Sequence, residues 1–178
     1  MLGASAAQCG ARAGQARAAA LVGMLAGMEA ALARGHRPLA LEAKPSFANL
    51  PVWKIVYRTE DRFHVDSVRA GRRTRFYAGT SAPVLDTTTH LHWLDPASQQ
   101  ARDVERFRWF SNGYVAPHPE DPLQVIDIRC SIVPDEIRPL WSIRLDPLAA
   151  PAQHVHYLER RDSDPARLRR FRDMLLGR

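Results

Sequence analysis

The spacing of apolar residues along this 178-residue chain changes from a helical period to a strand period, and this change limits the fold class. Between residues 12 and 34 the sequence is rich in alanine and free of proline. Its larger apolar residues recur at intervals of three and four, as on one side of an amphipathic helix: Leu21, Leu25, Met28 and Leu32. Gly35 and Pro38 follow and predict that the helix stops near Arg34.

From residue 52 onward, apolar and polar residues alternate with a period of two, which is typical of strands. The runs 52–58 and 63–68 flank Glu60 and Asp61 and predict a hairpin. Further runs have the composition of strands: residues 75–78, 113–116, 123–132, 141–145 and 155–159. We therefore expect a mainly antiparallel sheet of about five to six strands.

Two more helices are predicted, one in the middle of the chain and one at its end. Asp95-Pro96 has the residue types of an N-cap and a first helical position, ahead of a helix over 97–110 that Asn112-Gly113 ends. Its apolar side is expected to contain Val104, Phe107 and either Trp109 or Phe110. Asp164-Pro165 repeats the pattern ahead of a helix that places three apolar residues in the core: Leu168, Phe171 and Leu175.

These elements predict an α+β protein with a simple domain organisation. Residues 1–35 are expected to form an N-terminal tail and the amphipathic helix, and residues 36–178 a single α+β domain. The first ten residues lack the basic region of a secretory signal, and the uncharged run 18–28 is shorter than the ~20 residues that cross a bilayer. The sequence thus predicts no membrane-spanning segment of its own.

The formal net charge of +6 is concentrated at the two ends of the chain. Residues 45–158 carry thirteen basic and thirteen acidic side chains, so the neutral middle argues against a nucleic-acid partner. The predicted C-terminal helix and the residues before it are basic, and they are candidates for contact with an anionic lipid surface: Arg160, Arg161, Arg167, Arg169 and Arg170. The alternative is a solvated helix face whose charge Asp162, Asp164 and Asp173 moderate.

Two histidine pairs are candidate metal ligands: His90 with His92, and His154 with His156. Residues two apart on a strand lie on one face, where a carboxylate such as Asp86 or Asp95 could complete a site. The alternative is that these histidines are solvent-facing positions of half-buried strands. The sequence contains no His-Glu-x-x-His motif and no paired Cys-x-x-Cys motif, so no metal is expected to bind this chain alone.

Asp127 and Arg129 form a second candidate site, within an apolar run that includes Ile126 and Ile128. Residues two apart on a strand share a face, so the carboxylate and the guanidinium can pair. The pair is expected to be structural and to orient the turn at Pro134, although the same two groups could line a polar site. The sequence has no Gly-x-Ser-x-Gly motif and no glycine-rich phosphate loop, so it offers no complete catalytic motif.

Several segments together resemble the C-terminal half of one family, the membrane-bound metal-dependent hydrolases, also described as LexA-binding, inner-membrane-associated hydrolases. The resemblance runs from about residue 34 to residue 147 and is carried by aromatic and proline positions in these segments: 44–57, 63–66, 108–114, 127–137 and 139–147. In this family a histidine motif that binds a divalent metal lies in a membrane-embedded N-terminal half. No segment of this chain matches that motif, so no catalytic residue is carried over.

The resemblance implies that this chain is the cytoplasmic domain of such a hydrolase, at the inner face of the inner membrane. Its role would be accessory or substrate-presenting, and its partner would be the membrane-embedded half of the same protein or a separately encoded equivalent. The divalent metal is implied for the full-length family. The alternative is a non-enzymatic module that binds a protein, a lipid surface or a nucleic acid.

Overall fold

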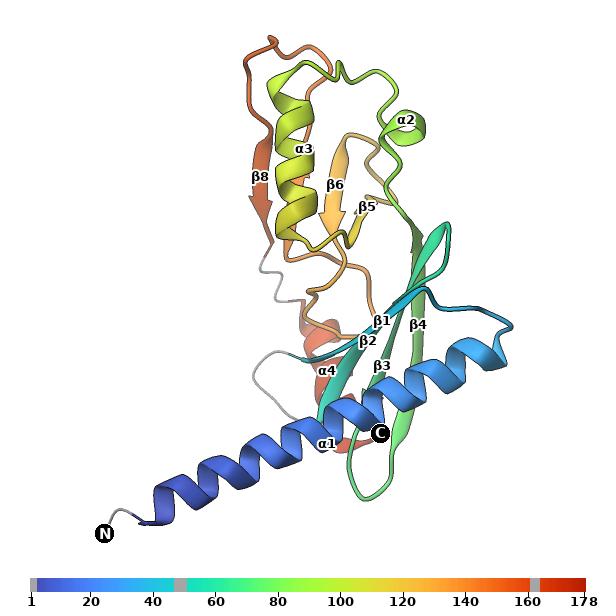
Figure 1. The fold of residues 1–178 in the computed structure, drawn as a ribbon, viewed down its shortest axis with the longest axis vertical. Coiled ribbons are helices and arrows are strands. Elements are labelled where there is room, and N and C mark those ends of the chain that lie inside the picture. Colours follow the sequence, from blue (N-terminus) through green and yellow to red (C-terminus); the bar gives the residue numbers. More distant parts are fainter. Residues whose placement is uncertain (1–2, 47–50, 161–163) are drawn as a thin grey trace.

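The computed structural model describes residues 3–46, 51–160 and 164–178, and it has the predicted α+β architecture (Figure 1). Its helices are α1 (Gly3–Ala33), α2 (Thr87–His90), α3 (Gln99–Phe110) and α4 (Pro165–Leu176). Its strands are β1 (Ala40–Pro45), β2 (Val52–Arg58), β3 (Arg62–Arg69), β4 (Arg75–Pro83), β5 (Val115–Pro117), β6 (Gln124–Asp127), β7 (Trp141–Arg144) and β8 (His156–Glu159).

The strands form two antiparallel four-stranded sheets: sheet A, in the order β1-β2-β3-β4, and sheet B, in the order β5-β6-β7-β8. The predicted hairpin is confirmed as β2 and β3. The prediction of one sheet of five to six strands is wrong, partly because it missed β1, which consists mostly of alanine, glutamate, lysine and proline, all depleted in strands. The run 123–132 is a strand only as far as Asp127, because the chain turns at Ile128 and Arg129.

The central strand β2 of sheet A is covered on both faces, because every residue from Val52 to Tyr57 is buried, whereas the edge strand β4 is largely exposed. On one face, Trp53 and Ile55 pack against α1, which contacts β1, β2 and β3. On the other face, Val52 packs with Met174 of α4. The period-two pattern of β2 therefore separates two buried surfaces rather than a buried surface from a solvated one.

Sheet B packs one face against α3. Val104 and Phe107 of α3 contact Val125 of β6 and Ile143 of β7 in one hydrophobic cluster. A separate cluster joins the two sheets: Val56, Phe63, Val65, Ala116 and Ile126. In Figure 1, sheet B and α3 lie above sheet A and α1, and α1 extends well beyond the edge of sheet A toward the N-terminus.

The helix termini show which local signals were specific. Gly35 has the left-handed φ of +75° that ends α1, and Asp164 caps α4 by accepting a hydrogen bond from the Ala166 amide, so both predicted helix ends are confirmed. The predicted start of α3 at Asp95 is wrong. Ser98 is its N-cap, whereas Asp95 accepts a hydrogen bond from the Ala97 amide in the preceding turn.

Candidate functional site

Helix α1 exposes its largest apolar side chains, the reverse of the usual amphipathic arrangement. Its contact with sheet A is made instead by small residues, among them Gly23, Gly27 and Ala31. The large residues lie on the opposite side of the helix, and we call them the α1 apolar face: Leu21 (59% exposed), Met24 (44%), Leu25 (62%), Met28 (40%) and Leu32 (61%). This face is the apolar stripe that the sequence analysis identified, with Met24 added.

Close packing by glycine explains why the helix is oriented in this way. A Cβ atom at Gly27 would lie 2.5 Å from Cγ2 of Ile55, a side chain that is completely buried in sheet A. A Cβ atom at Gly23 would lie 3.1 Å from Cδ1 of the same residue. Only the glycine side of α1 can approach sheet A this closely, so the leucines and methionines are left facing outward.

A polar network fixes the C-terminal end of α1 to sheet A. Arg34 donates two hydrogen bonds to the buried carboxylate of Asp66, at 2.7 and 3.0 Å, and a third to the Tyr57 hydroxyl at 3.0 Å. His36 lies 2.8 Å from the same hydroxyl, and its ring is 4.4 Å from that of His64. Sequence analysis missed this network because only the β2–β3 register and the position of α1 bring its members together.

A groove lined by aromatic side chains lies between α3 and the strands β7 and β8, with a volume of about 560 Å³. We call it the aromatic groove and define it by its most exposed large rings: Trp109 (83% exposed), Phe110 (54%), Trp141 (38%) and Tyr157 (59%). Arg106 and Glu159 also line it. Of the two rings expected on the apolar side of the helix, Phe110 stacks on the core residue Phe107 but stays half exposed, whereas Trp109 lies outside the core.

The structure places Asp127 and Arg129 in direct contact next to this groove. Arg129 donates from Nε and Nη2 to the fully buried carboxylate of Asp127, with a shortest distance of 2.6 Å. Its Nη2 also donates to the Phe110 carbonyl at 2.9 Å, and the guanidinium lies 5.8 Å from the centre of the Phe110 ring. The pair therefore holds the C-terminal end of α3, which carries two rings of the aromatic groove, and its expected role at the turn of Pro134 stays a prediction.

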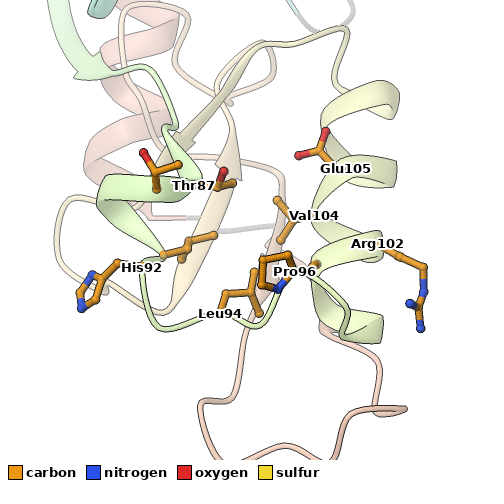
Figure 2. A pocket seen from close by; sticks show the side chains of 10 residues that line it. Thr87, His92, Leu94, Pro96, Arg102, Val104 and Glu105 are labelled. Carbon is orange, nitrogen blue, oxygen red and sulfur yellow. The ribbon is translucent and has the colours of Figure 1, made fainter.

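The first histidine pair does not lie on a strand, contrary to prediction. His90 ends the short helix α2, and His92 lies in the turn after it. The carboxylate of Asp86 is engaged by the hydroxyls of Thr88 and Thr89, which lower its pKa to about 2. A cavity of about 660 Å³ beside α2 and α3 is lined centrally by Leu94 and Pro96, whereas His92 and Arg102 point away from it on opposite sides (Figure 2).

The two residues of the second histidine pair have different surroundings. His154 Nδ1 lies 2.8 Å from the buried carboxylate of Asp103 on α3, whereas His156 is exposed at the start of β8. Burial opposes the ionisation of Asp103, but hydrogen bonds from Gln99, His154 and the Val155 amide outweigh it and lower the pKa. Among the described residues, no group of three or more His, Cys, Asp or Glu side chains could hold a metal ion. Those residues therefore do not fit the divalent metal that the resemblance implies for the full-length family.

The basic residues near the C-terminus differ in their ion pairs and in their exposure to solvent. Arg167 and Arg170 of α4 form ion pairs with Glu136 and Asp135, and the Arg170 pair has a fully buried carboxylate. Arg160 and Arg169 are exposed, and Arg161 lies outside the described residues. Leu168, predicted to be in the core, is 45% exposed, whereas Met174 is buried.

Lys54 is a buried titratable group that the sequence analysis did not single out. Its Nζ donates to Ser131 Oγ at 2.8 Å and to the Glu136 carbonyl at 2.9 Å, and burial lowers its pKa to about 7. The alternation of β2 contained a signal for this, since Lys54 stands between Val52 and Val56 on one face. Ser131 donates its own hydroxyl to the Val133 carbonyl at 2.7 Å, so the contact joins sheet A to the segment before β7.

Comparisons with protein-family models, with curated proteins and with solved structures found no match to this chain. The resemblance to the membrane-bound hydrolases therefore stays a prediction. Within the described part of the chain, no helix is long and apolar enough to cross a membrane.

Proposed function

We propose that this chain is an accessory domain of a membrane-associated protein, and that α1 holds it against the bilayer surface through the α1 apolar face. The observation that carries the proposal is the set of five outward-facing leucines and methionines on a helix that is fixed to the domain by its opposite side. Helices that lie in the bilayer interface bury such a face about 5–10 Å into the boundary between headgroups and acyl chains.

The expected strength of this attachment follows from the exposed area. Burying a whole leucine or methionine side chain contributes ~1.5–3 kcal/mol. The five side chains are between 40% and 62% exposed, so moving them into lipid contributes on the order of 5 kcal/mol in total. This value corresponds to reversible attachment.

Attachment through α4 would be weaker and would depend on charge. Each basic residue near an anionic leaflet contributes ~1 kcal/mol, and salt screens this contribution. Arg167 and Arg170 are already paired with carboxylates of the domain. We therefore assign α4 an auxiliary contact and α1 the main one.

In this proposal, the hydrolase chemistry and the divalent metal that the resemblance implies belong to a membrane-embedded partner half. That half is part of the same protein or is separately encoded. The present chain supports it or presents its substrate from the cytoplasmic side of the inner membrane. The observation that supports an accessory role is the outward-facing set of leucines and methionines on α1.

Co-sedimentation with vesicles tests the proposal. The chain should bind neutral phosphatidylcholine vesicles at low and at high salt, and Leu25→Glu should abolish binding because it places a charge at the centre of the face. Leu39→Glu is the matched control, since Leu39 is 63% exposed outside the face. The proposal is overturned if neutral vesicles do not bind the chain, or if Leu25→Glu binds as well as Leu39→Glu. The proposal is also overturned if the unmodified chain self-associates but does not bind vesicles, and if Leu25→Glu abolishes this self-association. That result would assign the face to contact with a second copy of the chain.

A further inference from the structure

A cluster of titratable side chains lies at the C-terminal end of α1, and neither the bilayer contact nor the aromatic groove uses it. The cluster has five members: Arg34, His36, Tyr57, His64 and Asp66. We propose that these residues form a proton-sensitive latch, which holds α1 on sheet A at neutral pH and releases it as the pH falls. The latch requires only that α1 packs on sheet A, so it does not depend on the proposed function.

The hydrogen bonds of the latch require a neutral imidazole at His36. Arg34 donates to the Tyr57 hydroxyl at 3.0 Å, so the proton of this hydroxyl is left for Nδ1 of His36, 2.8 Å away. This nitrogen accepts only while it carries no proton, and the Tyr57 side chain is completely buried. Protonation would turn Nδ1 into a second donor facing the same hydroxyl and would leave the hydroxyl proton without its acceptor.

His64 packs against the other two rings of the latch in a partly buried position. Its ring is stacked on that of Tyr57, with ring centres 4.6 Å apart, and lies 4.4 Å from that of His36. Its neighbour on β4, Ser81, carries no charge. Burial is the main cause that lowers the pKa of His64, and nearby basic groups lower it further: His36, Arg34 and Arg62.

Asp66 acts in the opposite direction, but its carboxylate is already occupied. Arg34 donates two hydrogen bonds to it, and the Gly79 amide donates a third at 2.9 Å. When α1 opens, His64 becomes exposed to water and regains the ordinary histidine pKa of 6.5. The open state then binds a proton that the closed state lacks. Below pH 6.5 the equilibrium constant for opening therefore rises by up to about tenfold per pH unit for each proton bound.

The apolar contact beneath α1 is small, so the latch makes a large contribution to holding the helix. Val22 is the largest side chain that α1 adds to the cluster around Trp53 and Ile55, and the others are alanines: Ala19, Ala20 and Ala26. The large leucines and methionines of the helix face outward. Local opening is easiest where few apolar contacts are made. We therefore expect α1 to open before the rest of the domain.

Hydrogen exchange of the full chain at pH 7.5 and pH 5.0, corrected for intrinsic exchange rates, tests the latch. Carboxylates with an ordinary pKa of about 4 remain ionised at both pH values. The equilibrium constant for opening should rise about tenfold or more at pH 5.0 for the backbone amides of residues 20–33 in α1. The amides of α3 should keep their protection. No rise in α1, or an equal loss of protection in α1 and α3, would overturn the proposal.

A double variant, His36→Asn with His64→Gln, removes the titrating groups and keeps an acceptor near the position of Nδ1. Opening of α1 should then be equally rare at the two pH values. His156→Gln is the matched control, since His156 is exposed at the start of β8, and it should keep the full rise. A rise that persists in the double variant would rule the latch out.

A second measurement decides the matter even if the double variant does not fold. An NMR titration of the assigned imidazole signals of the unmodified protein should give His64 a midpoint below pH 6.5. A midpoint at or above this value would contradict the latch, because protonation of His64 would then not favour opening.

Discussion

Asp127 shows how much of one residue's role follows from its immediate neighbours in sequence. Its carboxylate is fully buried, and the side chain of its partner Arg129 is only 16% exposed. Asp127→Ala leaves a guanidinium without its counterion in a partly buried position, so the free energy of unfolding should fall by ~3–5 kcal/mol. Urea denaturation of the two proteins measures this difference.

Asp121→Ala is the matched control for this prediction. Asp121 pairs with Arg144, whose side chain is 48% exposed, and exposed ion pairs contribute only ~0–1 kcal/mol. Equal losses of stability in the two variants would contradict a structural role for Asp127. The pairing itself could be predicted from the sequence because it joins residues two apart. The contact with the Phe110 carbonyl could not, because it depends on where α3 ends relative to β6.

Lys54 should make the stability of the protein depend on pH in a defined window. Burial lowers its pKa to about 7 in the folded chain, from the ordinary lysine value of 10.5 that applies when the chain is unfolded. Between these values the unfolded chain binds a proton that the folded chain releases, so the free energy of unfolding rises with pH. The cost of burying the charge is fully present only below the folded-state pKa.

Lys54→Met tests this dependence by removing the titrating group from the same buried position. Its free energy of unfolding should lack the rise seen in the unmodified protein between about pH 7 and pH 10, a rise of up to ~1.4 kcal/mol per pH unit. Urea denaturation at a series of pH values measures the two profiles. Parallel profiles would show that Lys54 keeps an ordinary pKa despite its burial.

At the scale of single elements, the docking of α1 depends on the absence of a side chain at Gly27. An alanine normally stabilises a helix interior by ~1 kcal/mol relative to glycine. Here its Cβ would meet Ile55, which is buried and stiff at χ1, so Gly27→Ala should lower the free energy of unfolding by ~1–3 kcal/mol. Gly23→Ala is the control and should have a smaller effect, because its closest contact, at 3.1 Å, is with the flexible Cδ1 end of Ile55, and its other neighbours lie at 3.4 Å or more. A more stable Gly27→Ala variant would contradict the packing described for α1.

Two helix ends with local signals were predicted well, although the same Asp-Pro signal at Asp95-Pro96 misplaced the start of α3, and features that depend on distant partners were not predicted. Gly35 and the Asp164-Pro165 pair marked their helix ends because capping involves only neighbouring residues. The division into two sheets and the strand β1 could not be predicted, since strand partners are chosen by tertiary packing. The leucine stripe of α1 was recognised, but its outward direction is set by the contact of Gly27 with Ile55.

For the whole molecule, the structure separates two surfaces that the sequence did not distinguish. Helix α1 packs on sheet A and turns the α1 apolar face outward, away from the sheet. The aromatic groove lies beside sheet B. The aromatic groove could be anticipated only in part, because Trp109, Trp141 and Tyr157 come from three separate elements. A bilayer contact at the first surface leaves the second exposed.

The central claim is that the α1 apolar face enters the bilayer interface, and quenching by brominated lipid tests it most directly. A bimane label is placed at position 25 through Leu25→Cys, in a Cys9→Ser and Cys130→Ser background. The same label is placed at position 148, since Leu148 is 93% exposed in a loop before β8. With brominated phosphatidylcholine vesicles at high salt, the account predicts strong quenching at position 25 and none at position 148. Equal quenching at both positions, or none at position 25, would contradict it.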